Sequence, residues 1–412
     1  MSKSSKAPQL ALVLSGGGAR GAYEAGVLHY IRTMLPAKQR YRRFDIQCGA
    51  SVGAINTCFM VATAHDHDFQ AQQLRYLWEN LKQENIYQRN LKALLGFLGK
   101  GSQGLIFNLF RKNKSSTLLH FPGLLDTKPF IPFIRSAIPW KMVTRNIRSG
   151  LVQALSVVAT NVFTGRMELF IQKHPDVVYN GDHIVHFTKI EPEHARASAA
   201  IPAIFPTVPI NGVAYTDGGL RLNTPLSPAI HLGADAIFVI GLNHRAAPGE
   251  KIPSHGEKGQ PAALGQVLGR VMNSVFLDKI QYDLEQLERI NHLIESTEEL
   301  YGKNYLRDLN RLLEKKDPER QSRAHLLRKI GIFRIRPSQD IGEMFREIFR
   351  KDRASLGSFE KFLMRFLDAD PNSSTDFLSY IAFTKPYLKK IFELGFDDAQ
   401  TQHQALLEFF DR

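Results

Sequence analysis

The sequence predicts an α/β fold with a largely parallel central sheet. Its 412 residues are 43% hydrophobic and 23% charged, enough for one large domain with an appendage or for two domains. Short apolar runs typical of buried strands alternate with longer segments that have the apolar spacing of helices. This alternation favours strands that run parallel and are joined by helices.

The N-terminal part supplies the first elements of this pattern. In order, we expect a strand over 10–15, a helix over 19–35 that Pro36 ends, a strand over 44–50, and helices over 51–64 and 69–81. Strand patterns return over 151–160, 166–172, 183–188 and 235–242. A long helical pattern follows from about Leu264 to Leu313, and a strand pattern over 329–336 is a candidate to rejoin the core sheet.

Positive charge is concentrated in one part of the chain. The net charge is +13, and the residues between Glu84 and Glu168 contain twelve Lys and Arg against one acidic residue, Asp126, a net +11. A solvated surface is the simplest explanation of a charged run, but such exclusion of acids favours a partner with negative charge, either lipid head groups or nucleic acid. No nucleic-acid-binding motif accompanies the charge, so nucleic acid is not expected.

The glycines after the first strand allow two interpretations. Gly16, Gly18 and Gly21 have the G-x-G-x-x-G spacing of a dinucleotide-binding loop. That loop requires an acidic residue at the end of the second strand, whereas Asp45 lies at its start. Dinucleotide binding is therefore the weaker alternative, and the glycines can instead bring backbone N–H groups close to a substrate oxyanion.

The second strand ends in a sequence typical of a nucleophile elbow. Gly49-Ala50-Ser51-Val52-Gly53 is G-x-S-x-G between a strand and a helix, a turn so tight that Gly49 and Gly53 must lack bulk. A serine in a glycine turn that only caps the next helix is the alternative. The elbow interpretation makes Ser51 a candidate nucleophile, which needs a base and an oxyanion stabiliser.

The best candidate for that base is an aspartate. Asp217 follows a strand pattern and precedes Gly218 and Gly219, so a carboxylate is presented with little steric bulk, although the same residues also suit a simple hairpin turn. His231 and His244 are better explained as surface or core residues.

In combination, these motifs resemble a known family. The stretches "GGGARG", "GASVG" and "DGG", in that order, together with "ASAAIPAIFPTVPINGVAYTDGGLRLNTP" over 197–225, resemble the patatin-like phospholipases. The similarity covers about 11–242, and the segment "FLSYIAFTKPYLKKIFELGFDDA" is more weakly similar to the ends of long bacterial members. Ser15 departs from the family, in which many members have Asp, at a position that is not catalytic.

The resemblance implies a fold, an activity and a set of roles. The fold is a three-layer α/β/α arrangement with a mostly helical C-terminal extension. The activity is lipid acyl hydrolysis by a serine–aspartate dyad, of the phospholipase A or lysophospholipase type. The implied roles are Ser51 as nucleophile, Asp217 as base, an oxyanion hole formed by Gly16, Gly17, Gly18 and Ala19, and support from Arg20, Gly218 and Gly219.

We therefore expect a catalytic domain over 8–247 and a mostly helical region over 248–412. The domain contains a basic, apolar, cap-like insertion over 86–148, and Trp140 and other apolar side chains there are expected to insert at an anionic membrane. A non-catalytic lipid-binding protein remains an alternative. Neither a cofactor nor a metal is expected, and the two cysteines, Cys48 and Cys58, are expected to be buried.

No secretory signal or apolar span is apparent, which predicts a cytoplasmic protein that associates peripherally with membranes. Export without a cleavable signal stays open, as does the oligomeric state.

Overall fold

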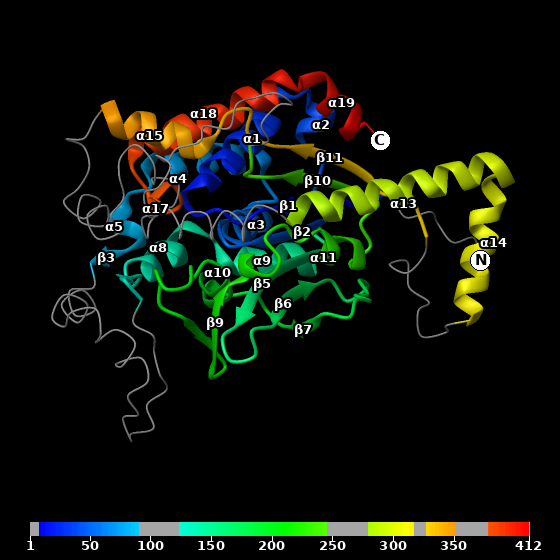
Figure 1. Cartoon of the computed structure of the whole chain (residues 1–412), viewed down its shortest axis with the longest axis horizontal. Helices are drawn as coiled ribbons and strands as arrows, with labels where there is room; N and C mark the ends of the chain where they lie inside the picture. Colours follow the sequence, from blue (N-terminus) through cyan, green and yellow to red (C-terminus); the bar gives the residue numbers. More distant parts are fainter. Residues whose placement is uncertain (1–7, 90–122, 245–278, 317–326, 352–377, 412) are drawn as a thin grey trace, which may run out of the picture.

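A mixed sheet forms the centre of the protein, in a computed structural model that describes residues 8–89, 123–244, 279–316, 327–351 and 378–411 (Figure 1). Its strand order is β11-β10-β1-β2-β5-β6-β7, and β9 pairs with β5 and with β8. The strands are β1 (Leu10–Leu14), β2 (Ile46–Ala50), β5 (Ala154–Asn161), β6 (Met167–Lys173), β7 (Ile184–Phe187), β8 (Val208–Ile210), β9 (Val213–Asp217), β10 (Ala236–Ile240) and β11 (Gly331–Ile335).

The sheet is parallel from β11 to β5, and its strands β1 and β2 lead into the glycine loop and the Ser51 turn. Beyond it, β6 and β9 both run antiparallel to β5. The strand pattern over 329–336 lies in the structure as β11, which pairs in parallel with β10.

Helices cover both faces of the sheet. In order they are α1 (Gly21–Met34), α2 (Ala37–Arg40), α3 (Val52–Ala62), α4 (His67–Asn80), α5 (Gln83–Ile86), α8 (Phe130–Ala137), α9 (Trp140–Arg148), α10 (Pro192–Ser198), α11 (Leu226–His231), α13 (Lys279–Tyr301), α14 (Lys303–Lys316), α15 (Ile341–Lys351), α17 (Leu378–Ile381), α18 (Lys385–Thr401) and α19 (His403–Phe410). Short 3₁₀ turns, η1 (Gly18–Arg20) and η2 (Gly218–Leu220), follow β1 and β9, and a small ribbon pairs β3 (Gln88–Arg89) with β4 (Leu125–Asp126).

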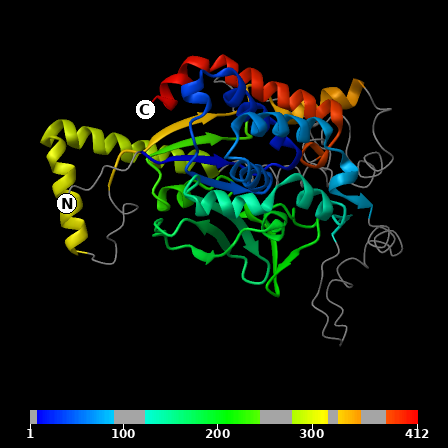
Figure 2. The same ribbon diagram turned by 180° about the vertical axis from the view of Figure 1, so that it is seen from behind.

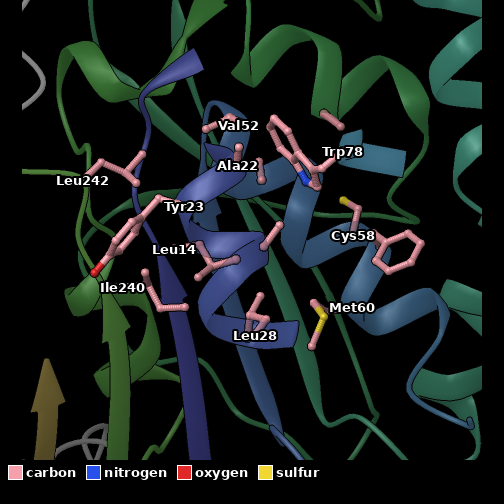
Figure 3. Close-up of a cluster of buried hydrophobic side chains, with 14 of the residues drawn as sticks. Leu14, Ala22, Tyr23, Leu28, Val52, Cys58, Met60, Trp78, Ile240 and Leu242 are labelled. Atoms are coloured by element: carbon pink, nitrogen blue, oxygen red, sulfur yellow. The ribbon is translucent and has the colours of Figure 1, made fainter. Parts of the chain in front are cut away.

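The alternation of side chains along β1 explains the three layers. Leu10, Leu12 and Leu14 pack with α1, α3 and α18, whereas Ala11 and Val13 pack with α11 and α13 on the other face. Figure 3 shows part of the first core, with side chains of α1 (Tyr23, Leu28), of the sheet (Leu14, Ile240) and of α3 (Cys58, Met60). Both cysteines are buried and free.

The long helical pattern expected over 264–313 is divided in the structure. Gly302, with φ +80°, separates α13 from α14, because a left-handed glycine ends a helix at little steric cost. Residues 264–278 lie outside the described part of the chain. Figure 2, the view from behind, shows α13 and α14 projecting from one side of the body.

The described part of the expected cap packs against the body. Helix α9 contacts α3, where the Asn146 amide donates to the carbonyls of Val61 and Ala62. Trp140 packs against the same core and donates its indole N–H to Ile134 O at 2.9 Å. The Trp140 ring is thus partly buried against the body, and its insertion at a membrane stays a prediction. Within the described ranges, no helix has the length and apolar character needed to cross a membrane.

Candidate active site

Ser51 lies at the sharp turn between β2 and α3, with φ 52°. This left-handed conformation is strained for a non-glycine residue, and such strain is common at functional turns. The neighbouring glycines make the turn possible: a Cβ on Gly49 would overlap the carbonyl of Gly53, and a Cβ on Gly53 would lie 2.5 Å from Leu14 O. The Ser51 N–H donates to Ser198 Oγ at 2.9 Å, which ties the turn to the end of α10.

The side chain of Ser51 meets that of Asp217. Ser51 Oγ donates to Asp217 Oδ2 at 2.6 Å, and both residues are buried. The second carboxylate oxygen, Oδ1, accepts from the Gly219 N–H at 2.7 Å. A Cβ on Gly218 would overlap the Val158 carbonyl, so this glycine lets the chain turn directly against β5. The two glycines thus hold the carboxylate in place after the end of β9.

Burial changes the acid–base behaviour of this pair. Desolvation raises the pKa of Asp217 to about 7, although the hydrogen bonds from Ser51 and Gly219 lower it in part. A carboxylate with this pKa is a much better base for an alcohol than an exposed aspartate, whose pKa is about 3.9. The described residues contain no group of three or more His, Cys, Asp or Glu that can hold a metal ion.

The glycine loop lies beside Ser51, but its glycines differ in whether their N–H groups are free to bind an oxyanion. The Gly16 N–H donates to Asn223 O at 3.0 Å, so in this structure that N–H is not free for an oxyanion, contrary to our expectation. Gly16 instead permits close packing, because a Cβ there would lie 2.9 Å from Ser51 Cβ. Among the described residues, the N–H groups of Gly17 and Gly18 donate to no other backbone group.

The far side of the glycine loop contacts the C-terminal segment. Arg20 is buried, donates through Nε and Nη2 to Ser379 Oγ at 3.0 and 2.6 Å, and lies 4.0 Å from the centroid of the Tyr380 ring. Gly18 has φ +56°, and a Cβ there would overlap the carbonyl oxygen of Tyr380. Arg20 therefore supports the loop through α17 and makes no contact with Ser51. No local pattern in the sequence indicates a role for Ser379 or Tyr380; the one signal is the weak family similarity of the segment that contains them.

An apolar pocket opens at Ser51. Its walls come from α3, α4, α8 and the segment after α10, with side chains such as Phe59, Trp78, Phe130 and Phe205. Arg196 is the one charged residue among those that line it in the described part of the chain. The pocket can accept an acyl chain with its ester group near Ser51.

The residues considered as alternatives lie elsewhere. His231 ends α11 and its ring lies against Tyr179 and His183, while His244 Nδ1 contacts Pro337 O at 3.1 Å. Asp45 Oδ2 accepts from the Leu10 N–H at 2.9 Å, at the opposite end of β1 from the glycine loop. Neither histidine contacts the dyad, and Asp45 is not placed to bind a ribose in the way that dinucleotide binding requires.

A second buried carboxyl group, Glu24, lies under the pocket. Its Oε2 accepts from the Asn56 amide at 2.8 Å, and Asn56 Oδ1 accepts from the Trp78 indole at 3.2 Å. Complete burial raises the pKa of Glu24 well above its usual range, while hydrogen bonds from Asn56 and from the backbone of Ser15 lower it in part. Burial therefore favours the neutral form of Glu24, which has no place in the dyad.

Comparisons with known proteins agree with the motifs. A profile of the patatin-like phospholipases matches residues 12–230. A cGAMP-activated phospholipase of Pseudomonas aeruginosa is 29% identical over 219 residues, which are 52% of this chain and 53% of that protein. The chain thus spans about half the length of this curated relative. A crystal structure of VipD from Legionella pneumophila is 13% identical, with 92% of this chain and 91% of that chain covered and a TM-score of 0.29.

Proposed function

Since the chain belongs to the patatin-like phospholipase family, we propose that it hydrolyses phospholipid esters as a phospholipase A or lysophospholipase. The observation that carries this proposal is the 2.6 Å hydrogen bond from Ser51 Oγ to Asp217 Oδ2 at the end of an apolar pocket. The cGAMP activation named for the Pseudomonas relative is not carried over, because the similarity covers about half of that protein.

The proposed reaction proceeds through an acyl-enzyme. Asp217 accepts the Ser51 proton while Oγ attacks the ester carbon, and the N–H groups of Gly17, Gly18 and Ala19 stabilise the oxyanion. The intermediate collapses, and the proton passes from Asp217 to the leaving alcohol of the lysolipid or glycerophosphoester. Asp217 then takes a proton from water, whose oxygen attacks the acyl-enzyme; as the Oγ–acyl bond breaks and the fatty acid leaves, that proton returns from Asp217 to Ser51 Oγ.

The test is fatty-acid release from phospholipid vesicles by the wild type, Ser51→Ala and Asp217→Asn. We expect each variant to lose at least about 10³-fold in activity, because nucleophile and base act as one unit. Ser338→Ala and Asp176→Asn, both on exposed residues, are the matched controls and should retain wild-type rates. Wild-type activity in either dyad variant would refute the dyad. A folded wild type without activity that still binds vesicles would favour the non-catalytic alternative.

We also propose that the basic insertion places the enzyme on an anionic membrane. Lys141, Arg145 and Arg148 are exposed on one face of α9, whose opposite face, with Val143 and Ile147, is buried in the body. Each such cation near an anionic surface contributes about 1 kcal/mol, an attraction that salt weakens.

Vesicle co-sedimentation tests this surface. The wild type should bind vesicles that contain phosphatidylglycerol, and Lys141→Gln/Arg145→Gln/Arg148→Gln should bind them about tenfold less tightly or worse. The control Arg307→Gln/Arg311→Gln/Lys315→Gln removes three exposed cations from α14 and should bind as the wild type does. Equal wild-type binding to neutral and anionic vesicles at low salt contradicts the proposal.

A further inference from the structure

Arg196 is the one residue in the described lining of the apolar pocket that carries a charge. It lies on α10, two residues before Ser198, whose hydroxyl accepts the Ser51 N–H at 2.9 Å. The helix that presents the guanidinium is thus attached directly to the nucleophile turn. An arginine in such a position is expensive, because burying its charge next to phenylalanine and isoleucine side chains costs free energy unless a partner compensates it.

No such partner is present among the described residues. Arg196 Nε is buried and makes no hydrogen bond. The carboxylate of Glu193, which acts on Arg196 electrostatically, is hydrogen-bonded instead by Arg135, whose Nη2 donates to Glu193 Oε1 at 2.7 Å. Burial lowers the pKa of Arg196, an effect that Glu193 opposes and Arg135 reinforces. Arg135, Glu193 and Arg196 together carry one net positive charge, and Arg196 is the member of the three that lines the pocket.

We infer that Arg196 binds the phosphate group of the lipid whose ester is cleaved at Ser51, an inference that rests on the proposed function. In a glycerophospholipid the phosphodiester is the anion closest to the scissile esters, separated from them by the glycerol carbons. A guanidinium matches two phosphate oxygens with parallel N–H donors. Arg196 therefore selects phospholipids over neutral acylglycerols, while the apolar walls accept the acyl chain of either.

The turnover test compares two soluble, short-chain substrates below their micellar concentrations, dihexanoyl-phosphatidylcholine and dihexanoylglycerol. Arg196→Gln should lower kcat/KM for the phospholipid by about 10- to 100-fold and for the neutral lipid by less than about threefold. Arg196→Lys should fall between, since it keeps the charge but loses the paired donors. Lys189→Gln, which removes an exposed cation just before α10, is the control and should change neither rate.

A parallel loss on both substrates would overturn the inference, because it would show that Arg196 acts only on the structure of the site. A binding arm separates this inference from the proposed chemistry. Dihexanoyl-phosphatidylcholine should bind Ser51→Ala at least about tenfold more tightly than Ser51→Ala/Arg196→Gln in calorimetry. Equal affinities would overturn the phosphate subsite even if hydrolysis is confirmed. A wild type that binds through Arg196 but does not turn over would leave the subsite standing and refute the proposed function.

Discussion

Gly16 and Gly18 lie two residues apart in the glycine loop, but they make room for neighbours from opposite ends of the chain. A Cβ on Gly16 would collide with Asn223 and Ser51, whereas a Cβ on Gly18 would collide with the backbone of Tyr380. The first side of the loop is built from the motifs within residues 12–230, and the second from α17, far outside that match. The C-terminal segment therefore forms part of the support of the site, although the groups proposed to react lie within residues 12–230.

Among the changes that compare the two sides of the glycine loop, the largest effect is expected at Gly18. Gly18→Ala should lower kcat by more than about 100-fold, because the new methyl group must displace either the loop or the Tyr380 carbonyl, and loss of one oxyanion donor alone costs about 10²–10³. Gly212→Ala is the matched control: Gly212 also has positive φ, +81°, but a Cβ there meets nothing within 4 Å. The control should lose only about 1–2 kcal/mol of stability and should keep wild-type activity. Equal activity of the two variants would contradict support of the loop by α17.

The pH dependence of activity tests the first side of the glycine loop, which is built from the motifs that include Ser51 and Asp217. Because Asp217 must be ionised to act as base and its pKa is about 7, kcat/KM should fall on the order of tenfold per pH unit below 7. The folded-state pKa lies above the unfolded value, so the folded state binds more protons and stability declines as the pH rises from about 4 to 7. Asp217→Asn removes this effect, and its Tm at pH 8 should equal or exceed that of the wild type. An activity profile that is flat from pH 5 to 8 would refute the assignment of Asp217 as base.

A smaller effect is expected at Ser379, on the C-terminal side. Ser379→Ala removes the oxygen to which Arg20 Nε and Nη2 donate, and a lost partner of a buried charged group costs about 1–3 kcal/mol. We expect kcat to fall about tenfold while KM for a monomeric ester stays within about twofold, since the pocket is untouched. Ser338→Ala is again the control. A rise in KM at constant kcat would show that Ser379 shapes the pocket and does not position the loop.

The division between local motifs and contacts of distant segments also explains what the sequence could predict. Ser51, Asp217 and the glycines beside them are found by local rules, because a tight turn excludes bulk wherever it occurs, and the family resemblance supplies their pairing. The engagement of the Gly16 N–H by Asn223, and the contact of Arg20 with Ser379, join residues more than 200 positions apart and follow from no local pattern. The alternation of strands and helices predicted the sheet, but the antiparallel direction of β6 and β9 depends on pairing that the alternation does not encode.

The smallest effect is expected at Glu24, beneath the motif side of the loop. Burial raises the pKa of this carboxyl group and favours its neutral form, so Glu24→Gln matches the shape and charge of that form and keeps an acceptor for the Asn56 amide. Activity at pH 7 should stay within about threefold of the wild type, whereas Glu24→Ala should lower Tm because it leaves a cavity under Trp78. The raised pKa makes wild-type stability decline as the pH rises above the unfolded-state value, a decline that Glu24→Gln lacks. The difference in Tm between Glu24→Gln and the wild type should therefore grow with pH, and a constant difference from pH 5 to 9 would show that Glu24 is ionised in the folded protein.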